Sequence, residues 1–76
     1  MIQTGKLYKL QKSALSHHLL VVDNNSVVDT INYEDVFVIL EVIRTTEYNM
    51  VLYKVLTKNG ITGKISLWET ELDVAE

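Results

Sequence analysis

The chain has 76 residues, of which 47% are hydrophobic and 22% are charged, and its formal net charge is −3. This length suits one small domain, and the hydrophobic fraction excludes an intrinsically disordered chain, which would combine low hydrophobicity with high net charge. The absence of cysteine excludes a disulfide framework and a thiolate zinc site, so we expect an unusually apolar core or self-association to stabilise the fold.

No signal for export or membrane insertion is visible. Residues 1–6 lack the apolar core and the small-residue cleavage site of a secretory signal. The longest apolar run, Val36 to Ile43, contains Glu41 and is much shorter than the ~18 residues that span a membrane. We therefore expect a soluble, cytoplasmic protein without membrane contact.

The first half of the chain predicts one short strand and one irregular hairpin. Lys6 to Gln11 is typical of a strand. Between Ser13 and Asp35, the apolar runs 19–22 and 27–31 flank a polar stretch. Asn and Asp favour turns because their side chains hydrogen-bond to the local backbone. The pattern predicts a long hairpin whose tip lies at the asparagine pair 24–25.

The middle of the chain predicts a central strand followed by a tight hairpin. Asp35 to Ile43 is too apolar and β-branched for a surface helix, and the polar stretch 44–49 ends it. Met50 to Lys58 and Ile61 to Ile65 are β-prone arms around Asn59-Gly60, a pair that supplies the positive φ angles of a type I′ turn. Apolar and polar residues alternate in the second arm, so we expect it to bury one face.

The C-terminal segment predicts one helical turn and a short edge strand. Ser66 and Glu69 have the spacing of a capping box, in which the two side chains satisfy the first backbone donors of a helix. Residues 71–74 then alternate like an edge strand. A short helix with Trp68, Leu72 and Ala75 on one side is the alternative, and we favour the strand.

This order of elements resembles a Src-homology-3-like (SH3-like) barrel. The segments that agree are residues 7–10 (LYKL), Asp35 to Leu40, the hairpin from Tyr53 to Ser66, and Leu67-Trp68-Glu69. The resemblance implies one all-β domain over residues 1–76. That domain would be a barrel of five to six strands with a long irregular hairpin loop and one short helical turn near the C-terminus. The chain is also similar to small bacteriophage and bacterial proteins.

The groove by which this family reads proline-rich peptides is depleted of aromatic residues here. An aromatic-lined groove receives the preformed polyproline helix of such peptides. Residues 49–50 stand where the family places a tryptophan, Ser66 replaces a proline, and Glu69 falls near the expected tyrosine. Tyr8 and Trp68 are the remaining groove candidates, so the resemblance does not extend to polyproline recognition.

No constellation for catalysis, metal binding or cofactor binding emerges. His17 and His18 are adjacent, so a strand would direct them to opposite faces, and only Asp23 and Asp29 lie near them as further ligands. Ser13 or Ser16 could form a triad with His18 and Asp23, but these residues lie within a predicted loop, which does not hold a nucleophile and its base rigidly. We predict no catalytic residues, no metal site, no cofactor and no enzymatic activity.

The anomaly in this sequence is that its central strands are apolar on both faces. A small isolated barrel is expected to present a polar outer face to water, and several exposed apolar side chains together mark an interface. The candidate interface residues are Phe37, Ile39, Ile43, Leu52 and Leu56. The alternative is that the excursion from Ser13 to Asp35 covers the outer face and forms a second core.

These features favour a non-enzymatic interaction or structural module that self-associates or docks on a protein partner. The alternative is a nucleic-acid-associated small barrel that uses Lys6, Lys9 and Lys12 together with nearby aromatic rings. The first 22 residues carry these three lysines and no acid, whereas the remainder holds ten acids against four bases. Because a nucleic-acid footprint needs clustered cations, the acidic balance disfavours this alternative.

Overall fold

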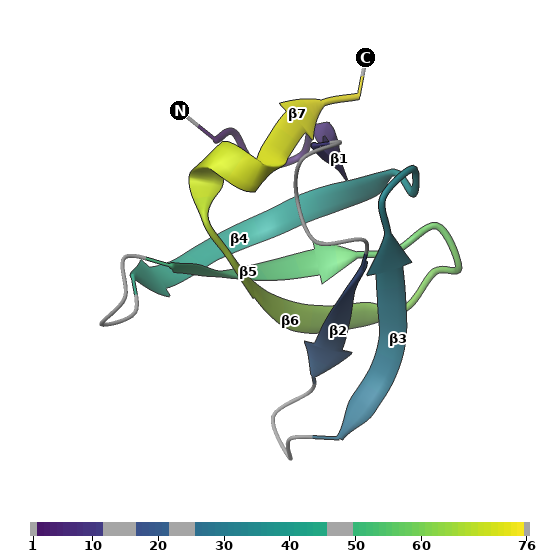
Figure 1. Ribbon diagram of the computed structural model, residues 1–76. Coiled ribbons are helices and arrows are strands. Elements are labelled where there is room, and N and C mark those ends of the chain that lie inside the picture. Colours follow the sequence, from purple (N-terminus) through teal and green to yellow (C-terminus); the bar gives the residue numbers. More distant parts are fainter. Residues whose placement is uncertain (1, 12–16, 22–25, 46–49, 76) are drawn as a thin grey trace.

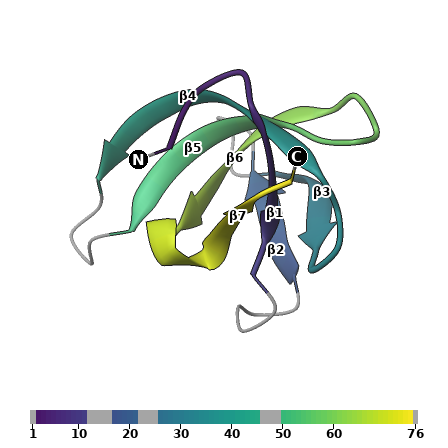
Figure 2. The same ribbon diagram turned by 90° about the horizontal axis from the view of Figure 1, so that it is seen from above.

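The computed structural model describes residues 2–11, 17–21, 26–45 and 50–75, which form one curved antiparallel sheet (Figure 1 and Figure 2). The strands are β1 (Leu7–Leu10), β2 (His17–Val21), β3 (Val27–Asn32), β4 (Phe37–Thr45), β5 (Val51–Leu56), β6 (Thr62–Leu67) and β7 (Leu72–Val74). A 3-10 turn, η1 (Glu69–Glu71), lies between β6 and β7. The all-β prediction and the short helical turn near the C-terminus are confirmed.

The strand order across the sheet is β3-β2-β6-β5-β4-β1-β7. The expected five to six strands are present when the three-residue β7 is set aside. Within the described residues no ladder joins the edge strands β3 and β7. None of the described helical segments is long and apolar enough to cross a membrane.

Two irregularities in β4 determine which of its residues face the core. Its pairing with β5 shifts between Ile39 and Glu41 and again between Val42 and Arg44. Each bulge inserts one extra residue, which resets the alternation of side chains. Ile39 and Val42 therefore lie on the same side of the sheet, where Val42 pairs with the buried Tyr53. Glu41 and Arg44 lie on the other side.

One apolar core occupies the concave side of the sheet. Its buried members are Tyr8, Leu10, Ile31, Phe37, Ile39, Tyr53, Val55, Ile65, Leu67 and Leu72. Ile31 comes from β3, so the hairpin of β2 and β3 adds to this same core. β2 also pairs with β6 through Val21 and Lys64. The described part of the excursion therefore extends the sheet beside β6 and adds Ile31 to the same core. Its predicted tip at 24–25 lies outside the described residues.

The β5–β6 hairpin is confirmed, but its turn differs from the predicted type. The Thr57 N–H donates to the Ile61 carbonyl (2.8 Å), and the Gly60 N–H donates to the Thr57 carbonyl (3.0 Å). Gly60 has a φ of 77°. These bonds define a three-residue loop, a turn followed by one left-handed residue, in place of a two-residue type I′ turn. The buried face of β6 is confirmed at Gly63, Ile65 and Leu67.

The helical turn begins two residues later than predicted. Ser66 still belongs to β6, and η1 starts after Trp68. The Trp68 N–H donates to the Glu71 carboxylate (2.9 Å), and the Glu71 N–H donates to the Trp68 carbonyl (2.9 Å). Glu71 thus replaces Glu69 as the reciprocal partner, and it is buried. The preferred edge strand is confirmed as β7.

Candidate interaction surface

The structure divides the five predicted interface residues between core and surface. Phe37 and Ile39 are 1% and 0% exposed, so the prediction that they lie on an outer face is wrong. The residues on both faces of β4 are apolar, so the sequence does not show which face is buried. Ile39 pairs with the buried Val55, and this pairing places Ile39 on the core side of the sheet. Ile43, Leu52 and Leu56 are half-buried. Leu52 and Leu56 lie on the outer side of β5, separated by the exposed Lys54.

Four apolar residues form a line across the outer side of β1, β4 and β5, and the last of them, Ala75, directly follows β7. Leu7 pairs with Val38, and Val38 pairs with Leu56. The Ala75 N–H donates to the Leu7 carbonyl (3.0 Å), which sets Ala75 beside Leu7. Directly opposed residues of antiparallel strands project on the same side. We call these four residues the outer row; Leu7 is 41% exposed, so the row is open to solvent.

Charged pairs of opposite sign flank the outer row. On one side, Lys9 of β1 is opposite Asp73 of β7. On the other side, Glu41 of β4 is opposite Lys54 of β5. All four residues are exposed. The outer face is therefore an apolar strip between two bands of mixed charge.

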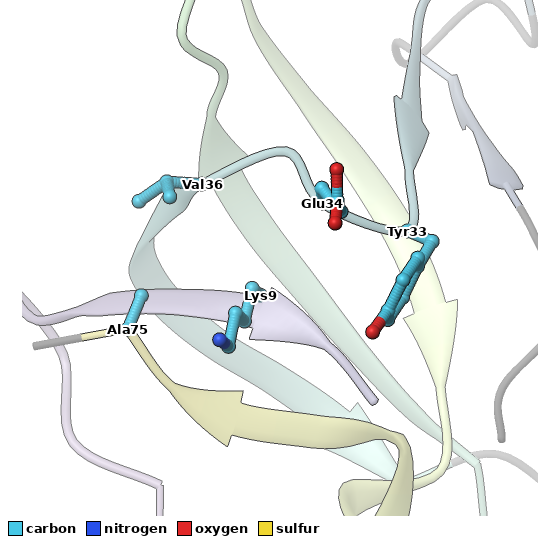
Figure 3. A pocket seen from close by; sticks show the side chains of 5 residues that line it. All are labelled: Lys9, Tyr33, Glu34, Val36 and Ala75. Carbon is cyan, nitrogen blue, oxygen red and sulfur yellow. The ribbon is translucent and has the colours of Figure 1, made fainter. Parts of the chain in front are cut away.

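A pocket of about 310 Å³ adjoins the outer row (Figure 3). Its lining residues are Lys9, Tyr33, Glu34, Val36 and Ala75. Figure 3 shows Val36 and Ala75 at one end and the Tyr33 ring and Glu34 carboxylate at the other, with Lys9 between them. Ala75 belongs to both the pocket and the outer row. The surface thus combines an apolar strip with a recess that has polar groups on one side.

A second hollow, of about 270 Å³, lies on the core side of the sheet beside η1. Ile2, Val42, Val51, Tyr53 and Glu69 line it, and we call it the η1 hollow. Val42 is 45% exposed although it shares the core side with Tyr53, so the core is open to solvent at this end. The sequence carries no signal for this hollow because the fold alone brings its distant residues together.

Burial and charge both act on the Tyr53 hydroxyl. Tyr53 is 1% exposed. Burial raises the pKa of Tyr53 above its usual 10.0, and the nearby negative charge of Glu69 raises it further, followed by a smaller effect of Tyr8. Both effects favour the neutral phenol. The hydroxyl therefore remains a potential hydrogen-bond donor and acceptor at physiological pH.

The two predicted groove residues differ in accessibility. Tyr8 is 3% exposed and belongs to the core. Its hydroxyl accepts a hydrogen bond from the Gln3 N–H (2.9 Å). Trp68 is 45% exposed. Of the two groove candidates, Tyr8 is therefore part of the core, whereas Trp68 is partly exposed to solvent.

The lysines of the nucleic-acid alternative and the adjacent pair His17 and His18 are only partly described. Lys6 and Lys9 are exposed, Lys9 faces Asp73, and Lys12 lies outside the described residues. The backbone of His17 and His18 belongs to β2, and their side chains are outside the description. Within the part of the chain that the structure describes, no three His, Cys, Asp or Glu side chains cluster as metal ligands.

A polar network joins the edge strand β3 to the β5–β6 hairpin. Asp29 accepts from the Thr30 N–H (2.8 Å) and from the Asn59 side chain (3.3 Å). Asp35 accepts from the Asn32 N–H (3.0 Å) and from the Lys58 ammonium (2.7 Å). We call these contacts the β3 network. Because carboxylates occupy two N–H groups of an edge strand, the network also blocks strand addition at those groups.

The β3 network shifts the pKa of both carboxylates. The hydrogen bond from the Thr30 N–H, followed by that from the Thr57 hydroxyl, lowers the pKa of Asp29 below 3.8. The hydrogen bond from Lys58, followed by that from the Asn32 N–H, lowers the pKa of Asp35 below 3.8. Hydrogen bonds to a charged carboxylate favour its ionised form. Both aspartates are therefore charged near neutral pH.

Comparisons with protein-family models, with curated proteins and with solved structures find no match to this chain. The resemblance to SH3-like barrels therefore retains only its coarse content, which is a small antiparallel all-β sheet.

Proposed function

We propose that this protein is a non-enzymatic interaction module that pairs with a second copy of itself through the outer row. The in-register line of four apolar residues carries this proposal. Exposed apolar area is removed from water on association, and complete burial of a large apolar side chain is worth about 1.5–3 kcal/mol. Leu40, next to the row on β4, adds a further apolar side chain that is 40% exposed.

The charges around the outer row favour a second copy as the partner. A two-fold symmetric contact brings the same surface of both molecules together. A surface of one sign would then repel itself. Here Lys9 with Asp73, and Glu41 with Lys54, supply both signs on each side of the row. A second copy can therefore place opposite charges against each other while the apolar strips meet.

The area needed for a stable contact extends this interface beyond the outer row. A standard interface buries about 800 Å² on each partner. The whole molecule exposes 4924 Å², and four partly buried side chains provide too little of it. The contact therefore has to include the pocket between Lys9 and Tyr33 and the flanking charged pairs. A domain of 76 residues also gains from such burial because a small core leaves little stability.

For the fold itself, we propose closure into an SH3-like barrel. The order of elements supports this: one strand, an irregular hairpin, three consecutive paired strands, a single 3-10 turn and a final short strand that pairs with the first. The strong curvature of the sheet in Figure 2 is in keeping with closure. A crystal structure, compared strand by strand with known barrels, tests this proposal.

Leu7→Glu tests the self-association directly. Leu7 is 41% exposed, so the change spares the core while it places a charge in the middle of the outer row. We expect the dimer dissociation constant, measured by analytical ultracentrifugation over a concentration series, to rise at least ~10-fold, since a tenfold change corresponds to only about 1.4 kcal/mol.

Val27→Glu is the matched control because Val27 is 56% exposed on β3, outside the outer row. This variant should associate like the wild type. Thermal melts at low protein concentration check that both variants fold. A wild type that stays monomeric at millimolar concentration, or an equal weakening by Val27→Glu, would overturn the proposal.

A further inference from the structure

The η1 hollow leaves a buried polar group without a partner. Tyr53 lines the hollow and is 1% exposed. Among the described residues, no backbone or side-chain group forms a hydrogen bond with the Tyr53 hydroxyl, whereas the Tyr8 hydroxyl does accept one from the Gln3 N–H. A buried hydroxyl without a partner loses the hydrogen bonds that water gave it. Such a group calls for an explanation, and one explanation is a group of a bound molecule that completes the site.

The walls of the hollow are suited to an aliphatic chain. Ile2, Val42 and Val51 supply apolar surface, and Val42 is 45% exposed, so the hollow is accessible from solvent. Its volume of about 270 Å³ falls below the ~300–1,000 Å³ of pockets that enclose a whole small molecule. The size therefore favours a single side chain that a larger partner inserts.

Charge selects among the side chains that could enter. Glu69 lines the same hollow, and its carboxylate is close enough to Tyr53 for its charge to act on the hydroxyl. Carboxylate and hydroxyl oxygens are two separate acceptors, one on η1 and one on β5. A compact ammonium, which has three donors, can use two separate acceptors, whereas a planar guanidinium is best matched by a single bidentate group.

We propose that the η1 hollow binds a lysine side chain of a partner protein. Its methylene groups lie against Val42 and Val51, and its ammonium donates to the Tyr53 hydroxyl and the Glu69 carboxylate. A long cationic side chain is suited to this arrangement because its stem is apolar and its head is charged. The hollow lies on the core side of the sheet, so this site is separate from the outer row and does not depend on self-association.

A blocked pentapeptide with lysine at the centre and alanine at the other positions tests the site. The matched peptide carries norleucine, which keeps the aliphatic stem and removes the charge. In an NMR titration of the full chain, the lysine peptide should shift the signals of Val42 and Val51. It should also bind at least ~5-fold more tightly than the norleucine peptide. Equal affinity of the two peptides would overturn the proposal.

Two protein variants separate the specific site from general attraction to an acidic protein. Glu69→Gln and Tyr53→Phe should each weaken the lysine peptide at least ~3-fold and leave the norleucine peptide unchanged. Asp73→Asn removes a carboxylate on the outer face and should change neither. Loss of binding in Asp73→Asn equal to that in Glu69→Gln would mean that the peptide responds to net charge alone, which would also overturn the proposal.

Discussion

The β3 network and the η1 hollow differ in whether their polar groups have hydrogen-bond partners. In the β3 network, the Asp35 carboxylate accepts hydrogen bonds from a backbone N–H and from the Lys58 ammonium, so each donor has an acceptor. In the η1 hollow, the Tyr53 hydroxyl is more deeply buried but has no such partner among the described residues. The first arrangement is complete and stabilises the fold. The second is incomplete, and it is there that a partner group gains most by binding.

The largest expected effect on the free energy of unfolding comes from removing the Tyr53 ring, in contrast to removing its hydroxyl alone. Tyr53→Ala removes a buried aromatic ring and should lower the free energy of unfolding by about 3–5 kcal/mol. Tyr53→Phe removes only the unpartnered hydroxyl and should leave stability within about 0.5 kcal/mol of the wild type, or raise it. Urea denaturation of both variants measures this difference. A loss of 2 kcal/mol or more in Tyr53→Phe would show that the hydroxyl is already satisfied, and the contrast with the β3 network would disappear.

The next effect concerns Thr57, which links the hairpin turn to the β3 network. Thr57 is 6% exposed, and its hydroxyl accepts from the Asn59 and Ile61 N–H groups, both at 3.3 Å. Thr57→Val keeps the shape but removes this acceptor, so it should cost about 2 kcal/mol of unfolding free energy.

Thr57→Ser is the control because it retains the hydroxyl. It should recover most of the stability lost in Thr57→Val, as measured in the same denaturation experiment. If serine and valine were equally destabilising, the lost methyl packing and not the hydrogen bonds would explain the effect, and the hairpin would not depend on its polar contacts.

Local sequence patterns were sufficient to predict elements whose side chains alternate regularly. β6 was recognisable because Gly63 and Ile65 alternate with the polar Thr62 and Lys64, and the structure buries that face. The asparagine-glycine pair located the hairpin, since a residue with positive φ is needed there. The turn type was not predictable from the pair alone because it depends on the register that places Thr57 opposite Ile61.

The residues of the candidate surfaces were harder to predict because β4 is bulged. Leu40 and Ile43 carry no mark of a bulge, and strict alternation assigns Ile39 and Val42 to opposite faces. The bulges reverse this and expose Glu41 and Arg44 on the outer side. Ser66 is likewise paired with Leu52 in the sheet, so it cannot cap the helical turn. The capping box therefore forms between Trp68 and Glu71, which have the same spacing as Ser66 and Glu69. Competition between equivalent local signals is decided by tertiary pairing.

The smallest effect should appear as a loss of the stabilisation by the β3 network in acid. The pKa of Asp35 is held below 3.8 in the folded chain, mainly by Lys58, so the unfolded chain binds its proton first as pH falls. This stabilisation is therefore fully present above about pH 4 and is lost as pH falls through the lower, folded pKa. Asp35→Asn should cost about 1 kcal/mol near pH 7 and much less near pH 2.

Thermal melts between pH 7 and pH 2 measure this convergence. Asp73→Asn is the control because Asp73 is exposed on β7 and lies outside the β3 network. Its melting temperature should follow that of the wild type at each pH. A constant difference between Asp35→Asn and the wild type over the whole range would mean that the Asp35 charge does not stabilise the edge of β3. The contrast would then depend on the Tyr53 hydroxyl alone. Tyr53 affects stability in alkali and not in acid. Because its pKa is raised in the folded chain, it stabilises the fold below about pH 10, and this stabilisation is lost as pH rises through the folded pKa.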